Sequence, residues 1–153
     1  MPPWRQSATV TSEGLLDSNV LIAALNSEHE HHAHSEALAR LDRRLTIAVH
    51  SLAETYSSLT RFPWHRPPDE AWAAVAALRQ RTELRSLTAG QQYDAIRHFA
   101  TRGLSGPLLH DALIGEVARA HAIGTIITWN TRHMTALFPD LRVVTPSQYL
   151  RRS

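Results

Sequence analysis

The sequence predicts one α/β domain, a three-layer α/β/α sandwich around a central, mainly parallel sheet. Five short apolar segments alternate with longer amphipathic ones along the 153 residues. Strands that alternate with helices usually pair in parallel and carry helices on both faces of the sheet. Because the chain has no low-complexity tract or interdomain linker, we expect a single domain over residues 14–150, preceded by a polar, flexible lead at 1–13.

Each element has its own local signal in the sequence. The strands are apolar and rich in branched residues, whereas the helices repeat apolar residues every three or four positions. The strands are expected at 14–17, 45–49, 84–87, 125–128 and 142–144. The helices are expected at 20–25, 34–44, 51–61, 69–81, 88–101, 106–122 and 130–137.

Composition excludes several kinds of chemistry. All 16 basic residues are arginine, so a Schiff-base lysine or a P-loop lysine is excluded, and the formal net charge of +2 is compatible with nucleic acid. The absence of cysteine excludes disulfides, thiolate nucleophiles and Cys-ligated zinc. Residues 1–13 lack the apolar core of a signal peptide, and no apolar run approaches membrane-spanning length. We therefore expect a cytoplasmic protein without a membrane partner.

Polar side chains stand where the predicted strands end. Asp17 closes the first strand, Glu54 is expected in the first turn of the helix after the second strand, and Asn130 follows the fourth. Asp111 is expected in the first turns of the helix that leads into the fourth strand. Ligands of such folds bind beyond the carboxyl ends of the strands, so we expect these side chains to meet there.

Three carboxylates at one sheet edge indicate a metal site. Like charges in close proximity raise one another's pKa, and a divalent cation relieves that conflict. Mg²⁺ and Mn²⁺ prefer oxygen ligands and can activate a bound water toward a phosphodiester. Asp17, Glu54 and Asp111 are therefore candidates for hydrolysis of phosphodiester bonds.

Each acid except Asp17 also has a structural interpretation. Ser51 and Glu54 have the spacing of a capping box, Asp111 near a helix start suits the helix dipole, and Asn130 suits an N-cap. Asp17 ends an apolar strand without a following turn residue, which makes a purely structural role the least plausible there.

Four segments, in order, resemble the motifs of PIN-domain nucleases, and their spacing is closest to that of the compact VapC toxins. The resemblance covers most of the chain, from about residue 14 to residue 150. The segments are LLDSNVLI at 15–22, HSLAE at 50–54, HDALI at 110–114 and TWNTRHM at 128–134.

The resemblance implies an endoribonuclease toxin that depends on Mg²⁺, for which Mn²⁺ can substitute. Asp17, Glu54 and Asp111 would be the metal ligands and would jointly position and activate the attacking water, while the Ser18 hydroxyl would support the site. Many family members carry an aspartate where this chain has Asn130, so a tightly held second metal is in doubt. The implied partners are an RNA substrate, a small neutralising antitoxin and a second copy of the chain in a homodimer.

Three other interpretations stay open. The chain could be a PIN module that binds RNA or a protein with little activity, which only Asn130 favours, or a DNA or structure-specific nuclease. A different phosphate enzyme on a similar sheet is disfavoured because the chain has no lysine.

The histidines at 29, 31, 32 and 34 suggest either a transition-metal site or, as we favour, a solvated entry to a helix. Trp64 and Trp72 are assigned to the core by default, with a partner groove as the alternative.

Overall fold

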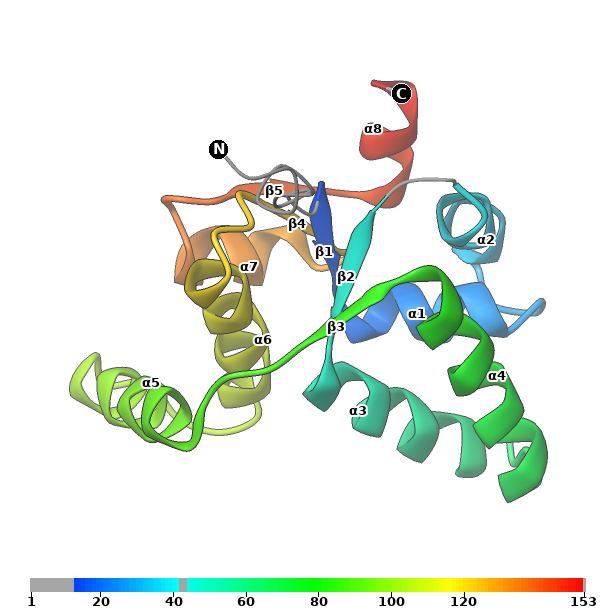
Figure 1. The fold of residues 1–153 in the computed structure, drawn as a ribbon, viewed down its shortest axis with the longest axis horizontal. Helices are drawn as coiled ribbons and strands as arrows, with labels where there is room; N and C mark the ends of the chain where they lie inside the picture. The colour runs from blue at the N-terminus through cyan, green and yellow to red at the C-terminus, as the bar shows by residue number, and fades with distance from the viewer. Residues whose placement is uncertain (1–12, 42–43, 153) are drawn as a thin grey trace, which may run out of the picture.

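The computed structural model describes residues 13–41 and 44–152, and it has the three layers that the sequence predicts (Figure 1). Five strands form one sheet in the order β3-β2-β1-β4-β5, and every neighbouring pair is parallel. The strands are β1 Gly14–Leu16, β2 Leu45–Ala48, β3 Glu83–Arg85, β4 Thr125–Ile127 and β5 Arg142–Val144. The predicted α/β/α sandwich is confirmed. Of the expected lead at 1–13, only Glu13 lies within the described residues.

Helices flank the sheet on both sides. Their bounds are α1 Ser18–Leu25, α2 His32–Ala39, α3 Val49–Thr60, α4 Pro68–Arg81, α5 Ala89–Thr101, α6 Leu108–Ala120, α7 Thr131–Leu137 and α8 Pro146–Arg151. The sequence analysis missed α8, although Thr145 and Gln148 form a complete capping box at its start. Among the described residues, no helix is long and apolar enough to cross a membrane.

Successive strand residues face opposite layers, which explains why the strands are apolar throughout. Leu15 and Ile126 pack into a core with residues of α6 and α7. Leu16 and Ile127, one position later, belong to the core that includes residues of α1, α2 and α4. Figure 1 shows α5, α6 and α7 on one side of the sheet and α1, α3 and α4 on the other.

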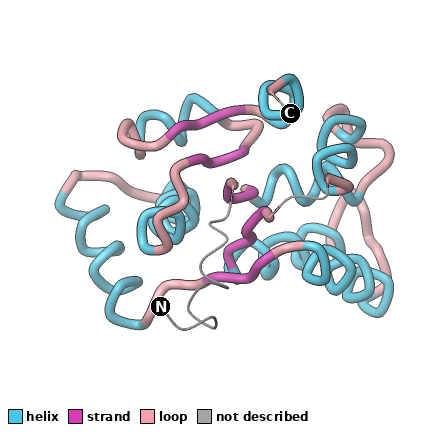
Figure 2. Tube along the Cα trace, turned by 45° about the horizontal axis from the view of Figure 1, so that its top comes forward, coloured by secondary structure: helices cyan, strands magenta, loops and turns pink. Residues whose placement is uncertain are grey.

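The order of the strands fixes where a crevice can form. The chain runs from β1 to β2 and β3 at one edge, and then returns to place β4 on the other side of β1. Figure 2 shows the strands in magenta with the helices around them. Open parallel sheets bind ligands where the winding direction reverses, beyond the carboxyl ends of the strands. Here that point lies between the ends of β1 and β4.

The aromatic residues near the first two helices depart in part from expectation. Trp72 is 64% exposed, so its default assignment to the core is wrong. Trp64 is half-buried, and its ring lies 6.4 Å from that of His29. His31 stacks on Trp129 at 4.0 Å, and His32 Nδ1 lies 2.9 Å from the carbonyl oxygen of Ala23. These contacts favour the structural interpretation of the histidine-rich entry to α2.

A close contact between Gly115 and Phe138 yields a test of the packing. A Cβ at Gly115 would lie 2.0 Å from the Phe138 ring, whereas a Cβ at Gly90 would have no atom within 4 Å. We expect Gly115→Ala to lower the free energy of unfolding by about 1–3 kcal/mol, because overpacking displaces a buried ring. Gly90→Ala, the control, should leave stability unchanged or slightly raised. Urea denaturation measures both, and equal stability of the two variants would contradict the described packing.

Candidate active site

Asp17 lies at the point where the winding of the sheet reverses. It follows β1 directly, and its side chain is 2% exposed. Its backbone N–H donates to the carbonyl oxygen of Ile127 at 3.0 Å, which ties it to the end of β4. The backbone N–H of Ser18 donates to Asp17 Oδ1 at 2.7 Å, and the Thr128 hydroxyl donates to Oδ2 at 2.8 Å. Both carboxylate oxygens are therefore held in place.

Two residues that the sequence analysis did not single out complete this network. Thr128, fully buried, accepts hydrogen bonds at Oγ1 from Asn19 Nδ2 and from the Asn130 backbone, each at 3.0 Å. Asn19 Oδ1 in turn accepts from the backbone N–H of Trp129 at 3.1 Å. Asn19 and Thr128 thus join the start of α1 to the end of β4. Their signal in the sequence was their place beside the predicted strand ends, within the segments 15–22 and 128–134 that resemble PIN-domain motifs.

Ser18 and Asn130 lie beside Asp17 and Thr128 respectively, and each contacts its neighbour. The Ser18 hydroxyl is 3.4 Å from Asp17 Oδ1, longer than the contact from its own N–H. Asn130 occupies the N-cap position of α7, as the structural interpretation predicted, but its side chain makes no capping hydrogen bond. Its Nδ2 lies 2.8 Å from Nδ1 of His133.

Glu54 lies in the second turn of α3 rather than the first, because the helix begins at Val49. The capping-box interpretation of Ser51 and Glu54 is wrong for the same reason. Ala48 is the N-cap residue without a capping side chain, and the buried Ser51 hydroxyl has no hydrogen-bond partner. Glu54 Oε1 is buried and also lacks a hydrogen-bond partner, and His50 Nε2 lies 3.6 Å from it.

Asp111 lies in the first turn of α6, as predicted, and is half-buried. The neighbouring His110 bridges α6 and α3, because its Nδ1 lies 2.9 Å from Nε2 of His50. The two rings are nearly parallel, with centroids 5.0 Å apart. The imidazole pair therefore stands between the helices that carry Glu54 and Asp111.

Burial dominates the electrostatics of all three acids. Burial, with smaller contributions from the charges of Asp111 and Glu54, raises the pKa of Asp17 to about 6, although the Thr128 hydrogen bond opposes this. Burial also raises the pKa of Glu54, opposed by His50 and His110. The pKa of Asp111 is raised by burial too, opposed by His133 and His110. The three carboxyl groups thus share one poorly solvated region.

Because the pKa of Asp17 is raised, ionisation of this carboxyl group lowers the stability of the folded state. The folded state holds this proton more tightly than the unfolded chain, so stability falls as pH rises from about 4 to about 6. The cost at neutral pH is on the order of 3 kcal/mol. A cation among the acids would offset it.

The donor set fits a hard divalent cation. Three carboxylates are available, and one of their oxygens, Glu54 Oε1, is buried without a hydrogen bond. Among the described residues, no group of three His, Asp or Glu side chains is already arranged so that it could hold a metal ion. Mg²⁺ commonly keeps several water ligands and takes only one or two carboxylates directly, so these residues suit it.

The family model described as PIN domain matches residues 14–136. The chain therefore belongs to the PIN-domain family.

One named relative matches about two thirds of this chain. A protein named Ribonuclease VapC40, from Mycobacterium tuberculosis, is 33% identical over 105 residues, which cover 68% of this chain and 77% of that one.

Solved structures show the same fold at lower identity. A Mycobacterium tuberculosis toxin, VapC20, described as cleaving the sarcin-ricin loop, superposes with a TM-score of 0.67 at 22% identity, covering 84% of this chain and 98% of that one. The DNA-bound VapBC of Salmonella typhimurium gives 0.64 at 21% identity, with coverages of 89% and 99%. A toxin–antitoxin complex from Klebsiella pneumoniae gives 0.58 at 22%, with 87% and 97%.

The hydrogen bond from Thr128 to Asp17 can be tested directly. Thr128→Val removes the hydroxyl that donates to Oδ2, so we expect the pKa of Asp17 to rise above about 6. Ser18→Ala keeps the backbone N–H, so we expect little change from it. Carboxyl ¹³C chemical shifts, followed against pH in the metal-free proteins, report the pKa of Asp17 in each of the two variants. A larger rise in Ser18→Ala than in Thr128→Val would contradict the network.

Proposed function

We propose that this protein is a metal-dependent endoribonuclease toxin of the VapC type, which hydrolyses RNA phosphodiester bonds and is neutralised by a cognate antitoxin. The observation that carries the proposal is the convergence of Asp17, Glu54 and Asp111 at the reversal point of the sheet, with the pKa of each raised. A relative at 33% identity is named a ribonuclease, which supports RNA as the substrate.

Asp17, Glu54 and Asp111 would hold Mg²⁺, with Mn²⁺ as a substitute. When bound, the cation would lower the pKa of a water and stabilise the leaving oxygen. Thr128 and the Ser18 backbone fix the direction of the Asp17 carboxylate, and Asn19 holds Thr128 in turn. Such positioning fixes the orientation of the Asp17 carboxylate before substrate arrives.

Asn130 stands where many family members carry an aspartate, and His133 is its neighbour at the site. Their side chains are in contact at 2.8 Å, and neither adds a carboxylate. This supports one principal metal ion held by three acids rather than two ions held by four.

The surface supports protein partners. Phe62 is 80% exposed and Trp72 is 64% exposed near the α3–α4 connection, while Tyr93 on α5 is 69% exposed. Large exposed apolar side chains mark protein interfaces where they form a contiguous patch. An open hollow of about 510 Å³ between α1, α2 and α4, lined largely by alanine and leucine, adds apolar surface. We propose that the antitoxin and a second copy of the chain cover such surfaces in the cytoplasm, as several structural relatives are toxin–antitoxin complexes.

Removal of any acid should abolish cleavage. We expect Asp17→Ala, Glu54→Ala and Asp111→Ala each to lower the rate of RNA cleavage by more than about 100-fold with the fold retained, because each removes a metal ligand. Cleavage of a mixed RNA pool with Mg²⁺, with Mn²⁺ and with chelator measures this. Asp94→Ala, which removes an exposed acid on α5, is the matched control.

The same assay separates the alternatives. Cleavage that persists in chelator would contradict the metal, and turnover near the wild-type rate in one variant would remove that residue from the site. Binding of RNA without cleavage by well-folded protein in either metal would favour the binding module. Faster cleavage of DNA of the same sequence would favour a DNA nuclease.

Metal affinity should depend on pH in a defined direction. Ligand carboxylates must lose their protons to bind a cation, and the pKa of Asp17 is about 6. We therefore expect affinity for Mn²⁺ to weaken progressively as pH falls from 7.5 through about 6. Calorimetric titration at several pH values measures it, and an affinity independent of pH across this range would contradict Asp17 as a ligand.

A further inference from the structure

A polar hollow of about 660 Å³ lies along the outer edge of the sheet between β5 and α8. β5 is an edge strand, and α8 follows it after a single residue. Three exposed arginines surround the hollow, and no acidic side chain lines it. Its lining consists of Arg142, Val143, Val144, Gln148, Arg151 and Arg152.

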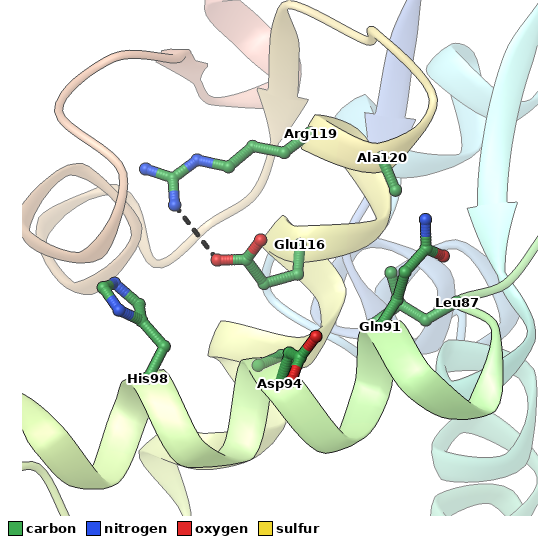
Figure 3. Close-up of a pocket in the computed structure, with 8 residues that line it drawn as sticks. Leu87, Gln91, Asp94, His98, Glu116, Arg119 and Ala120 are labelled. Atoms are coloured by element: carbon green, nitrogen blue, oxygen red, sulfur yellow. Dashed lines mark hydrogen bonds and ion pairs between the residues drawn. The ribbon is translucent and has the colours of Figure 1, made fainter.

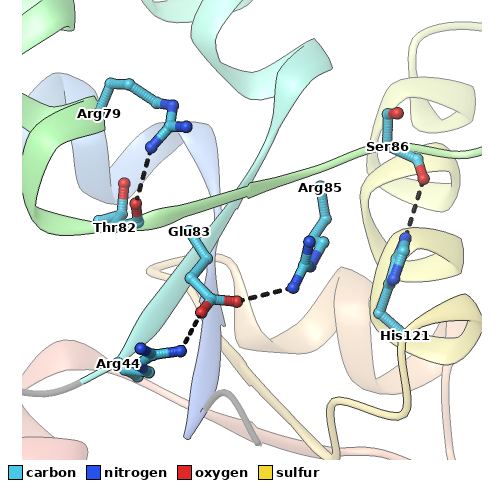
Figure 4. A network of polar contacts seen from close by, with 7 residues as sticks. All are labelled: Arg44, Arg79, Thr82, Glu83, Arg85, Ser86 and His121. Atoms are coloured by element: carbon cyan, nitrogen blue, oxygen red, sulfur yellow. Dashed lines mark hydrogen bonds and ion pairs between the residues drawn. The ribbon is translucent and has the colours of Figure 1, made fainter. Parts of the chain in front are cut away.

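Several arginines elsewhere in the described part of the fold are neutralised by carboxylates. Arg119, beside the hollow between α5 and α6, pairs with Glu116 (Figure 3) and with Asp140. Figure 4 shows Arg44 and Arg85 converging on the carboxylate of Glu83. These pairings compensate the positive charge locally.

The arginines beside β5 differ in this respect. Within the described part of the chain, Arg142 and Arg152 have no ion pair, and Arg151 donates only to the backbone oxygen of Ser147 at 3.4 Å. The hollow therefore carries uncompensated positive charge, and planar guanidinium groups suit phosphate oxygens.

The strand edge adds a backbone donor. Arg142 donates its N–H to Gly124, and Val144 accepts from Thr128, so both residues direct their backbone groups toward β4. Since alternate strand residues point their backbone groups to opposite sides, the N–H of Val143 faces the open edge. An anion in the hollow would meet this N–H together with the guanidinium groups.

We infer that the hollow between β5 and α8 is a phosphate-binding site for RNA outside the cleavage site. The inference rests on the proposed ribonuclease function. β5 borders β4 and lies two strands from β1, which Asp17 follows, and Arg142 pairs with Thr125 at the start of β4. An RNA strand cut at Asp17 would have to cross β4 to reach this edge. Several separated cations around one hollow fit successive phosphates better than a single carboxylate.

The test measures RNA binding with the metal removed. A labelled single-stranded RNA of about 20 nucleotides, longer than the sites of most single domains, is titrated in chelator at several salt concentrations. The variant is Arg142→Ala with Arg152→Ala. The matched control is Arg79→Ala with Arg81→Ala, which removes the same charge from α4. Thermal unfolding of each variant confirms that the fold is intact.

Loss of two phosphate contacts should flatten the dependence of log affinity on log salt by about 1.4, while the control should change it little. In Mg²⁺, the β5–α8 variant should show a raised KM and an unchanged kcat for long RNA. Equal slopes in the variant and wild type, or an equal change in the control, would overturn the site. A loss confined to duplex DNA or to an acidic peptide would overturn RNA as the ligand. If wild type cuts no RNA, the proposed function fails, and the binding titration still reports on this site alone.

Discussion

The Asp17 carboxylate is buried between the ends of β1 and β4, where water cannot solvate its charge. Its oxygens are held by the Ser18 backbone on one side and by Thr128, 111 residues further along the chain, on the other. An isolated ionised carboxylate in such a place is strongly unfavourable, so its neighbours must supply hydrogen bonds and positive charge. Thr128 supplies one of these hydrogen bonds, and Asn19 and the Asn130 backbone hold its hydroxyl oxygen in turn.

The other two acids reach this group from opposite layers. α3 packs on the side of α1, whereas α6 belongs to the core formed with α7. The hydrogen bond between His50 and His110 joins these layers across the end of the sheet. It is a direct side-chain contact between the helices that carry Glu54 and Asp111.

The fold followed largely from patterns that are local in sequence. Runs such as 125–128 are apolar because both sheet faces are covered, and this regularity predicted five strands and seven of the helices. The strand-end position of Asp17 and the helix-start position of Asp111 followed from the same rule. Asn19 and Thr128 were not predicted, because their roles depend on pairing between β1 and β4, which no local pattern records. Glu54 was misplaced by one turn because a β-branched Val49, typical of a strand, begins the helix.

The distance in sequence between Asp17 and Thr128 also governs when the site can exist during synthesis. A growing chain that has passed α5 already contains β1, β2 and β3, yet it still lacks Asp111, Thr128 and the strand that seats beside β1. The Asp17 carboxylate, which is buried in the finished fold, then lacks the Thr128 hydroxyl that orients it. The site is completed only when the last third of the chain emerges and β4 inserts between β1 and the edge. The candidate site therefore cannot form until synthesis of the chain is nearly finished.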